Sequence, residues 1–390
     1  MRFPLLPFAV AALVAVHFLP DPVSAQETPT ITIKKGNSVT VALDPLTGGD
    51  GPGATKILQN DLEISGWLQV GSPAQAGYTI RGTASGGSVT GWVVDRGGRE
   101  VLRANYSGGT RSAVHQFADE IVETLTGNRG IATSKIAFIS NKTGRKEVYL
   151  ADYDGANVIQ LTRDNAISVS PSLGPDARKL AYTGYQSGYA DVYLIDIPSG
   201  ARNRILKYPG TNTGAAISPN GGRIAVSLSK DGNPELYVTS INGGGAKRLT
   251  RTRGVEASPT WSPGSDAIIY TSDNGGTPQL YRISASGGSP TLISTGHSYN
   301  TEPSWSPDGR RVAFNVKGGS GFQVAIKDLT GGSTSIASTG GSAENPAFGP
   351  SSRHVAYSMG GSIWIVDIFT GKRFQVISGV GNATQPTWSL

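Results

Sequence analysis

The stretch Glu302-Pro303-Ser304-Trp305-Ser306-Pro307-Asp308-Gly309 contains the motif that decides the fold, because its pattern recurs along the chain. The large apolar residue in fourth place, Trp305 here, is the anchor of each copy. Successive anchors are 44, 44, 44, 43 and 40 residues apart, and they are Leu173, Ile217, Trp261, Trp305, Phe348 and Trp388. Such a period matches the roughly 40–45 residues of a four-stranded propeller blade.

An apolar strand is expected after the turn that follows each anchor, at residues 179–183, 223–228, 267–271, 311–315 and 354–358. A sixth strand of this kind, residues 136–140, has no anchor before it, whereas Trp388 has no strand after it. We therefore expect circular closure, with residues 383–390 supplying the innermost strand of the blade whose other strands lie at 136–162. The repeat predicts six blades.

Proline stands two residues before the anchor in five of the six copies. A proline inside a central strand removes a ladder hydrogen bond, which normally argues against a strand. The pattern fits a strand whose edge faces a central tunnel, where no neighbouring strand needs the missing N–H. The anchors themselves are expected to pack between neighbouring blades.

Residues 26–130 have a different sequence pattern, a mixture of expected strands and helices that is typical of a small α/β domain. Expected strands lie at 31–34, 39–43, 78–82, 89–94 and 101–106, with a helix at 54–64. A second helix follows from apolar residues at helical spacing between Val114 and Leu125, with Thr110 near its start and Gly127 past its end. The predicted fold is thus mainly β, a six-bladed β-propeller over 131–390 with an N-terminal α/β domain over 26–130.

Residues 1–25 have the pattern of an export signal, with Arg2, an apolar run over 3–19 and small residues at 23–25. The competing interpretation is a membrane anchor, but the run is shorter than the ~20 residues of a spanning helix. We expect cleavage after Ala25. The chain has no cysteine, which excludes disulfides, thiolate zinc sites and cysteine nucleophiles.

The formal net charge is +6, without a long cluster of basic residues. Nucleic-acid binding is therefore poorly supported, because phosphate recognition concentrates positive charge on one face. The positive net charge favours an acidic protein or an anionic envelope polymer as the binding partner. No metal or cofactor is expected. His115 is interpreted as a structural histidine, and Asp152–Asn157 as a hairpin turn in preference to a calcium loop.

Several stretches resemble the TolB family of the Tol-Pal envelope system, among them residues 60–67, 115–119, 151–155 and 228–233. The resemblance implies a periplasmic scaffold, not an enzyme, that is peripheral to the membranes and monomeric by itself. It further implies that one mouth of the propeller binds the lipoprotein Pal and that residues 26–33 engage TolA. Roles in outer-membrane integrity and in constriction at cell division follow from the same resemblance.

The tunnel mouth is the expected binding surface, because the residues three places before the anchors should form one ring. Family contacts for Pal carry over onto Thr211, Gly214, Ala257 and Ser258. With the polar residues around the ring, the predicted partner-binding set is Thr211, Asn212, Gly214, Glu256, Ala257, Ser258, Asn300, Thr301, Glu302, Glu344 and Asn345. A solvated tunnel entrance without a partner is the plainer alternative.

Two other function classes stay open on the sequence. A secreted propeller enzyme acting on glycans would need a cluster of carboxylates, for which Glu256, Glu302 and Glu344 are the candidates. A generic cell-surface binding module would not need the N-terminal domain.

Overall fold

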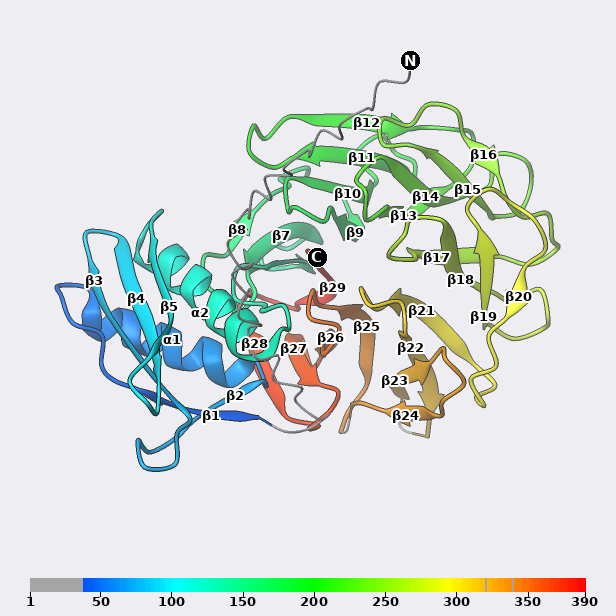
Figure 1. Cartoon of the computed structure of the whole chain (residues 1–390). Helices are drawn as coiled ribbons and strands as arrows, with labels where there is room; N and C mark the ends of the chain where they lie inside the picture. The colour runs from blue at the N-terminus through cyan, green and yellow to red at the C-terminus, as the bar shows by residue number, and fades with distance from the viewer. Residues whose placement is uncertain (1–37, 320, 339) are drawn as a thin grey trace, which may run out of the picture.

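The structure is a computed structural model that describes residues 38–390 apart from 320 and 339. The expected export signal, the segment 26–33 and the expected strand at 31–34 lie outside the described residues. Figure 1 shows a sheet with two helices lying beside a ring of six smaller sheets.

The N-terminal part is one five-stranded sheet in the order β2-β1-β3-β4-β5. β1 pairs in parallel with β2 and β3, and the other pairs are antiparallel. The elements are β1(Val39–Leu43), α1(Gly51–Ile64), β2(Leu68–Val70), β3(Tyr78–Ser85), β4(Ser88–Asp95), β5(Glu100–Tyr106) and α2(Thr110–Thr126). The sequence did not predict β2, which is only three residues long.

Both helices pack on the sheet and on each other. α1 begins three residues earlier than expected, because Pro52 occupies its first turn, where a missing N–H costs nothing. α2 buries the expected apolar face and ends at Gly127, whose φ of 67° is left-handed. Its Phe117 ring would lie 2.4 Å from a Cβ at Gly91, so β4 needs a glycine where this helix crosses it.

The propeller consists of six four-stranded antiparallel sheets, which confirms the predicted fold class. Blade 1 contains β29(Thr384–Trp388), β6(Lys135–Ser140), β7(Glu147–Asp152) and β8(Ile159–Gln160). Blade 2 contains β9(Ser168–Leu173), β10(Lys179–Gly184), β11(Asp191–Asp196) and β12(Arg202–Leu206). Blade 3 contains β13(Asn212–Ile217), β14(Arg223–Leu228), β15(Glu235–Ser240) and β16(Lys247–Arg248).

The other three blades repeat this arrangement. Blade 4 contains β17(Glu256–Trp261), β18(Ala267–Ser272), β19(Gln279–Ser284) and β20(Thr291–Leu292). Blade 5 contains β21(Asn300–Trp305), β22(Arg311–Gly318), β23(Gly321–Asp328) and β24(Thr334–Ile336). Blade 6 contains β25(Ala343–Phe348), β26(His354–Met359), β27(Ser362–Asp367) and β28(Arg373–Ile377).

The C-terminal strand closes the ring, as the unmatched anchor predicted. β29 pairs antiparallel with β6, with Trp388 opposite Ile136. The Trp388 side chain is 4% exposed, and its Nε1 donates a hydrogen bond of 2.7 Å to Ser134 Oγ. In Figure 1 the C-terminus accordingly lies on the inner side of the ring, next to β29.

The anchors are buried between blades, as expected. Trp261 packs with Leu236 of blade 3 and Tyr270 of blade 4 in one apolar cluster. A larger cluster continues from the N-terminal helices through Ile131 into blades 1 and 6, so the two parts of the molecule share a core. Within residues 38–390, leaving out 320 and 339, no helix has the length and apolarity that crossing a membrane would require.

Removing the closure strand should destabilise the propeller strongly. Loss of a buried Trp alone costs ~3–5 kcal/mol, so Trp388→Ala should lower the free energy of unfolding by about that amount, and deletion of 381–390 by more. Trp364→Ala is the matched control, because Trp364 is only partly buried on β27. Urea unfolding measures all three variants; a Trp388→Ala variant as stable as the Trp364→Ala variant would contradict closure through β29.

Candidate functional site at the propeller mouth

The six innermost strands surround a channel of about 250 Å³. Four successive positions of each strand line it, from three residues before the anchor to the anchor itself. The prolines expected at a tunnel-facing edge, such as Pro259 and Pro303, are among the lining residues. Positions that recur in the sequence therefore form successive layers around one axis.

The first layer is a ring of residues in left-handed backbone conformation. Each lies three residues before an anchor, at a β-bulge where the pairing with the second strand shifts register. The six φ angles are 51° at Ser170, 62° at Gly214, 49° at Ser258, 53° at Glu302, 57° at Asn345 and 52° at Gln385. Non-glycine residues seldom adopt such angles, and bulges of this kind re-aim side chains. The left-handed conformation at this position is therefore a repeated structural feature of the channel.

A second layer joins the blades to one another. At four of the six blade junctions, the backbone N–H of an anchor donates to a hydroxyl that stands one residue before the preceding blade's anchor. The bonds run from Ile217 to Ser172 (3.0 Å), from Trp305 to Thr260 (3.2 Å), from Phe348 to Ser304 (2.9 Å) and from Leu173 to Thr387 (3.2 Å). These hydroxyls satisfy N–H groups that have no strand partner on the channel side.

Most predicted site residues do lie at the mouth. Gly214, Ser258, Glu302 and Asn345 belong to the ring and line the channel. Ala257, Thr301 and Glu344 lie beside the ring and are partly exposed, and Thr211 is exposed just before β13.

Three predicted residues are placed differently and correct the expectation that their side chains face the mouth. Asn212, Glu256 and Asn300 are 0% exposed. Each is the first residue of an innermost strand, and alternation along the strand directs it inward between blades. The Asn212 amide, for example, donates to the carbonyls of Tyr208 (2.9 Å) and Ala190 (3.1 Å). The side chains of these three residues therefore lie buried between the blades and stabilise the segments that form the rim.

Glu302 links two blades. Its Oε2 accepts hydrogen bonds from the Nδ2 groups of Asn315 (2.5 Å) and Asn345 (2.7 Å), and from the Asn345 backbone N–H at 3.2 Å. Burial raises the pKa of Glu302, although these donors act in the opposite direction.

Sequence reasoning missed an apolar part of the rim. Ile167 and Val255, six residues before their anchors, are 46% and 43% exposed, and Tyr189 on the β10–β11 turn is 70% exposed. The β10–β11 turn lies beside Ile167, whose carbonyl accepts the Tyr185 N–H at 3.0 Å. The repeat itself could have indicated these positions, since it places Ile167, Thr211 and Val255 equivalently.

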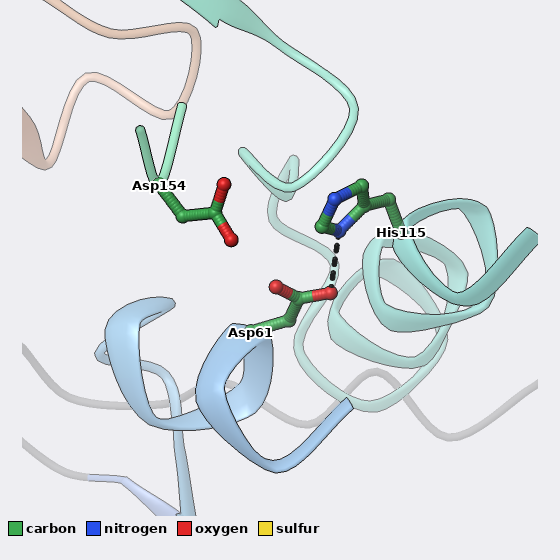
Figure 2. A group of neighbouring side chains, drawn as sticks. All are labelled: Asp61, His115 and Asp154. Atoms are coloured by element: carbon green, nitrogen blue, oxygen red, sulfur yellow. Dashed lines mark hydrogen bonds and ion pairs between the residues drawn. The ribbon is translucent and has the colours of Figure 1, made fainter. Parts of the chain in front are cut away.

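The N-terminal part contacts the opposite end of the propeller, where the turns after the anchors lie. A polar cluster there joins Asp61 of α1, His115 of α2 and the turn after β7. Figure 2 shows the Asp154 carboxylate directed toward the other two side chains. His115 Nδ1 lies 2.7 Å from Asp61 Oδ2, and the Tyr153 hydroxyl donates to Asp61 Oδ1 at 2.7 Å. Burial raises the pKa of Asp61.

One ligand atom each from Asp61, His115 and Asp154 lie within 4.8 Å of one another, a spacing that could hold a metal ion. Both oxygens of Asp61 already accept hydrogen bonds, and Asp154 is paired with Arg111. The nearby Asp152 is likewise paired with Arg111 and Lys135. These contacts fit a role in joining the two parts better than a metal centre, and they agree with the interpretation of residues 152–157 as a hairpin turn.

A second junction lies on blade 6. Arg353, which is 0% exposed, donates from Nη2 to Asp367 Oδ2 at 2.7 Å. Its guanidinium lies 4.3 Å from the ring centroid of Trp67, in the segment after α1. Burial alone would raise the pKa of Asp367, but hydrogen bonds from Arg353 and neighbouring donors hold it below its usual value.

Residues 122–390 match the family described as the TolB beta propeller domain. The chain belongs to the TolB beta-propeller family. It is 36% identical over 135 residues to the Tol-Pal system protein TolB of Geobacter sulfurreducens, covering 33% of this chain and 31% of that protein. Over 197 residues it is 34% identical to a TolB homologue of Chlorobium chlorochromatii, covering 40% of this chain and 44% of that protein. The matches thus span less than half the length of these curated relatives.

Solved structures extend the likeness beyond the propeller. TolB from Acinetobacter baumannii superposes with a TM-score of 0.81 at 27% identity, covering 90% of this chain and 97% of that one. The putative TolB from Agrobacterium tumefaciens, with a TM-score of 0.51 at 17% identity over 66% of this chain and 97% of that one, shares the fold. The N-terminal part is therefore a shared feature of the first pair.

The polar cluster at the junction gives a test. Asp61→Asn removes one acceptor from a buried pair of partners and should lower the free energy of unfolding by ~1–3 kcal/mol. Glu63→Gln on the exposed side of α1 should change it by less than ~0.5 kcal/mol. Calorimetric melts with and without EDTA should coincide for the wild type. An EDTA-sensitive melt that Asp61→Asn abolishes would instead show a metal centre.

Proposed function

We propose that this protein is a periplasmic scaffold of a Tol-Pal assembly that binds a Pal-like lipoprotein at the propeller mouth and a TolA-like protein through residues 26–33. The observation that carries the proposal is the likeness to TolB from Acinetobacter baumannii over 90% of the chain. In this role the protein supports outer-membrane integrity and constriction at cell division.

The geometry favours the mouth as the docking surface. The N-terminal part rests on blades 1 and 6 at the other end of the ring, and the contacts made by its residues 38–130 lie away from the mouth. Ring residues gather polar side chains from five of the six blades around one channel, with the exposed side chains of Val255 and Tyr189 at its rim. Protein-binding surfaces combine exposed apolar side chains with polar groups.

Charge at the rim indicates an acidic partner. Exposed basic residues stand on the connections that lead into the inner strands and on the turn after β6, namely Lys142, Arg145, Arg251 and Arg253. Complementary charge speeds encounter and orients the partner more than it adds affinity.

The glycan-enzyme alternative gains no specific support. It would need Glu256, Glu302 and Glu344 as a working set in one mouth, whereas Glu256 is 0% exposed and Glu302 is held by two asparagines. The docking function is therefore the better account of the same residues.

Substitutions at the mouth should weaken binding of the lipoprotein domain. Thr211→Arg inserts bulk and charge at the rim, and Glu302→Ala removes a group that holds the ring, so each should cost ~2–5 kcal/mol of binding free energy. Leu292→Ala, at an exposed position on the outermost strand β20, is the control and should leave affinity unchanged. Isothermal calorimetry measures the affinities, and melts confirm folding. Wild-type affinity in both folded mouth variants would move the site elsewhere.

Loss of residues 26–33 should abolish binding of the TolA-like protein and leave binding of the lipoprotein intact or tighter. Two separate binding segments can be coupled, but each retains its own contacts. A protein in which residues 26–33 are scrambled, with length and composition kept, is the matched control and should behave like the deletion. Unchanged TolA binding by both proteins would contradict this assignment.

A further inference from the structure

Two buried carboxyl groups face each other beneath the rim, between blades 3 and 4. Glu235 is the first residue of β15 and Glu256 the first residue of β17, and both are 0% exposed. Both contact Thr252, whose N–H donates to Glu235 Oε1 at 2.7 Å and whose hydroxyl donates to Glu256 Oε1 at 2.8 Å, and each influences the pKa of the other. Two ionised carboxylates cannot share such a site without a large electrostatic penalty.

Neighbouring blades show what this junction normally contains. At the equivalent junction between blades 4 and 5, Asn300 Nδ2 donates to Gln279 Oε1 at 2.6 Å. Between blades 2 and 3, Asn212 Nδ2 lies 3.4 Å from Asp191 Oδ1. In both, an amide of the inner strand donates to an oxygen of the preceding blade. The Glu256 side chain has no N–H, so it can donate a hydrogen bond at this junction only when its carboxyl group carries a proton.

The hydrogen bonds assign that proton to Glu256. Glu235 Oε1 accepts from Arg248 Nη2 at 2.9 Å and from the Thr252 N–H at 2.7 Å, which suits an ionised carboxylate. Among the described residues, no hydrogen bond of normal geometry reaches the buried Glu235 Oε2, although the Thr250 hydroxyl lies near this carboxylate. A proton on Glu256 would satisfy this oxygen.

The electrostatics agree with the geometry. Burial raises the pKa of Glu256 to about 7, and the adjacent Glu235 adds to the rise while the hydroxyls of Ser272 and Thr252 oppose it. Burial would also raise the pKa of Glu235, but hydroxyl, amide and Arg248 donors hold it below its usual value. Tyr270 of β18 and Tyr237 of β15 also face the pair, and Asp231 lies 3.8 Å from Arg248.

The pair is directly connected to the rim segment 251–255. The Thr252 hydroxyl donates to Glu256 Oε1 at 2.8 Å, while its N–H holds Glu235. The same hydroxyl accepts the Gly254 N–H at 3.1 Å. A second negative charge in the pair would therefore act first on this segment.

We propose that Glu235 and Glu256 form a proton-binding site that holds the rim segment 251–255 closed in mildly acidic conditions and loosens it toward neutral pH. At pH values between the ordinary pKa of a glutamate and the raised pKa of Glu256, the closed segment binds one more proton than the open segment. Opening therefore becomes more favourable as the pH rises through that window and levels off above it. An effect on docking at the mouth follows only if the proposed function holds.

Hydrogen–deuterium exchange of the full chain at pH 5, 6, 7 and 8 tests the site without any partner. After correction for intrinsic rates, exchange at Thr252 and Gly254 should rise by about tenfold per pH unit between pH 5 and 7 and then level off. Segment 207–211, which leads into Asn212 and contains no histidine or carboxyl group, is the internal reference and should show no such rise. Glu256→Gln restores the donor found in neighbouring blades and should abolish the dependence, whereas Glu63→Gln on the exposed side of α1 should leave it unchanged.

Two results would overturn the proposal: corrected exchange at Thr252 that does not change between pH 5 and 7, or a Glu256→Gln variant that keeps the dependence. If Glu256→Gln fails to fold, carboxyl ¹³C titration of the wild type decides, because Glu256 must then titrate close to pH 7. Lipoprotein affinity measured over the same pH range separates the two hypotheses. Absence of binding at every pH would refute the docking function and leave the exchange result standing.

Discussion

Closure of the ring by the C-terminal strand is the constraint on which the rest of the structure depends. β29 comes from the end of the chain and pairs with β6, so blade 1 is assembled from residues more than two hundred positions apart. This pairing brings blades 1 and 6 together. The N-terminal part rests on both, through Arg111 with Asp154 on blade 1 and Trp67 with Arg353 on blade 6. The seat of the N-terminal part therefore exists only in the closed ring.

The two ends of the closed propeller channel differ in what surrounds them. At one end, buried polar contacts and a shared apolar core fix the N-terminal part. At the other, the six left-handed ring residues and the connections around them face the channel. Buried hydrogen bonds between the two parts, such as that from the Tyr153 hydroxyl to Asp61, are costly to break, so the first end suits a permanent junction. The open mouth, with partly exposed polar groups and exposed Val255 and Tyr189, suits an exchangeable partner.

Much of the fold could be predicted because the repeat encodes it. The spacing of the anchors predicted the six blades, and Trp388, an anchor with no strand after it, predicted that the C-terminal strand closes the ring. The mouth was only partly predictable. Alternation along a strand directs Asn212, Glu256 and Asn300 inward while their neighbours face outward. The β-bulge three residues before each anchor interrupts that alternation, and no single residue type in the sequence predicts where such a bulge occurs. The His115 contacts likewise depend on packing between elements far apart in sequence, which periodicity does not reveal.

The central claim is that a partner docks at the mouth, at the end of the ring away from the N-terminal part, which rests on blades 1 and 6. The most direct test is a hydrogen–deuterium exchange footprint of the purified Pal-like lipoprotein domain on the full chain. The account predicts protection confined to the rim, at residues 211–214, 255–258, 299–302 and 342–345. Protection on the outer strands β8, β20 and β24, or on the sheet β1–β5, with the rim unprotected, would contradict it.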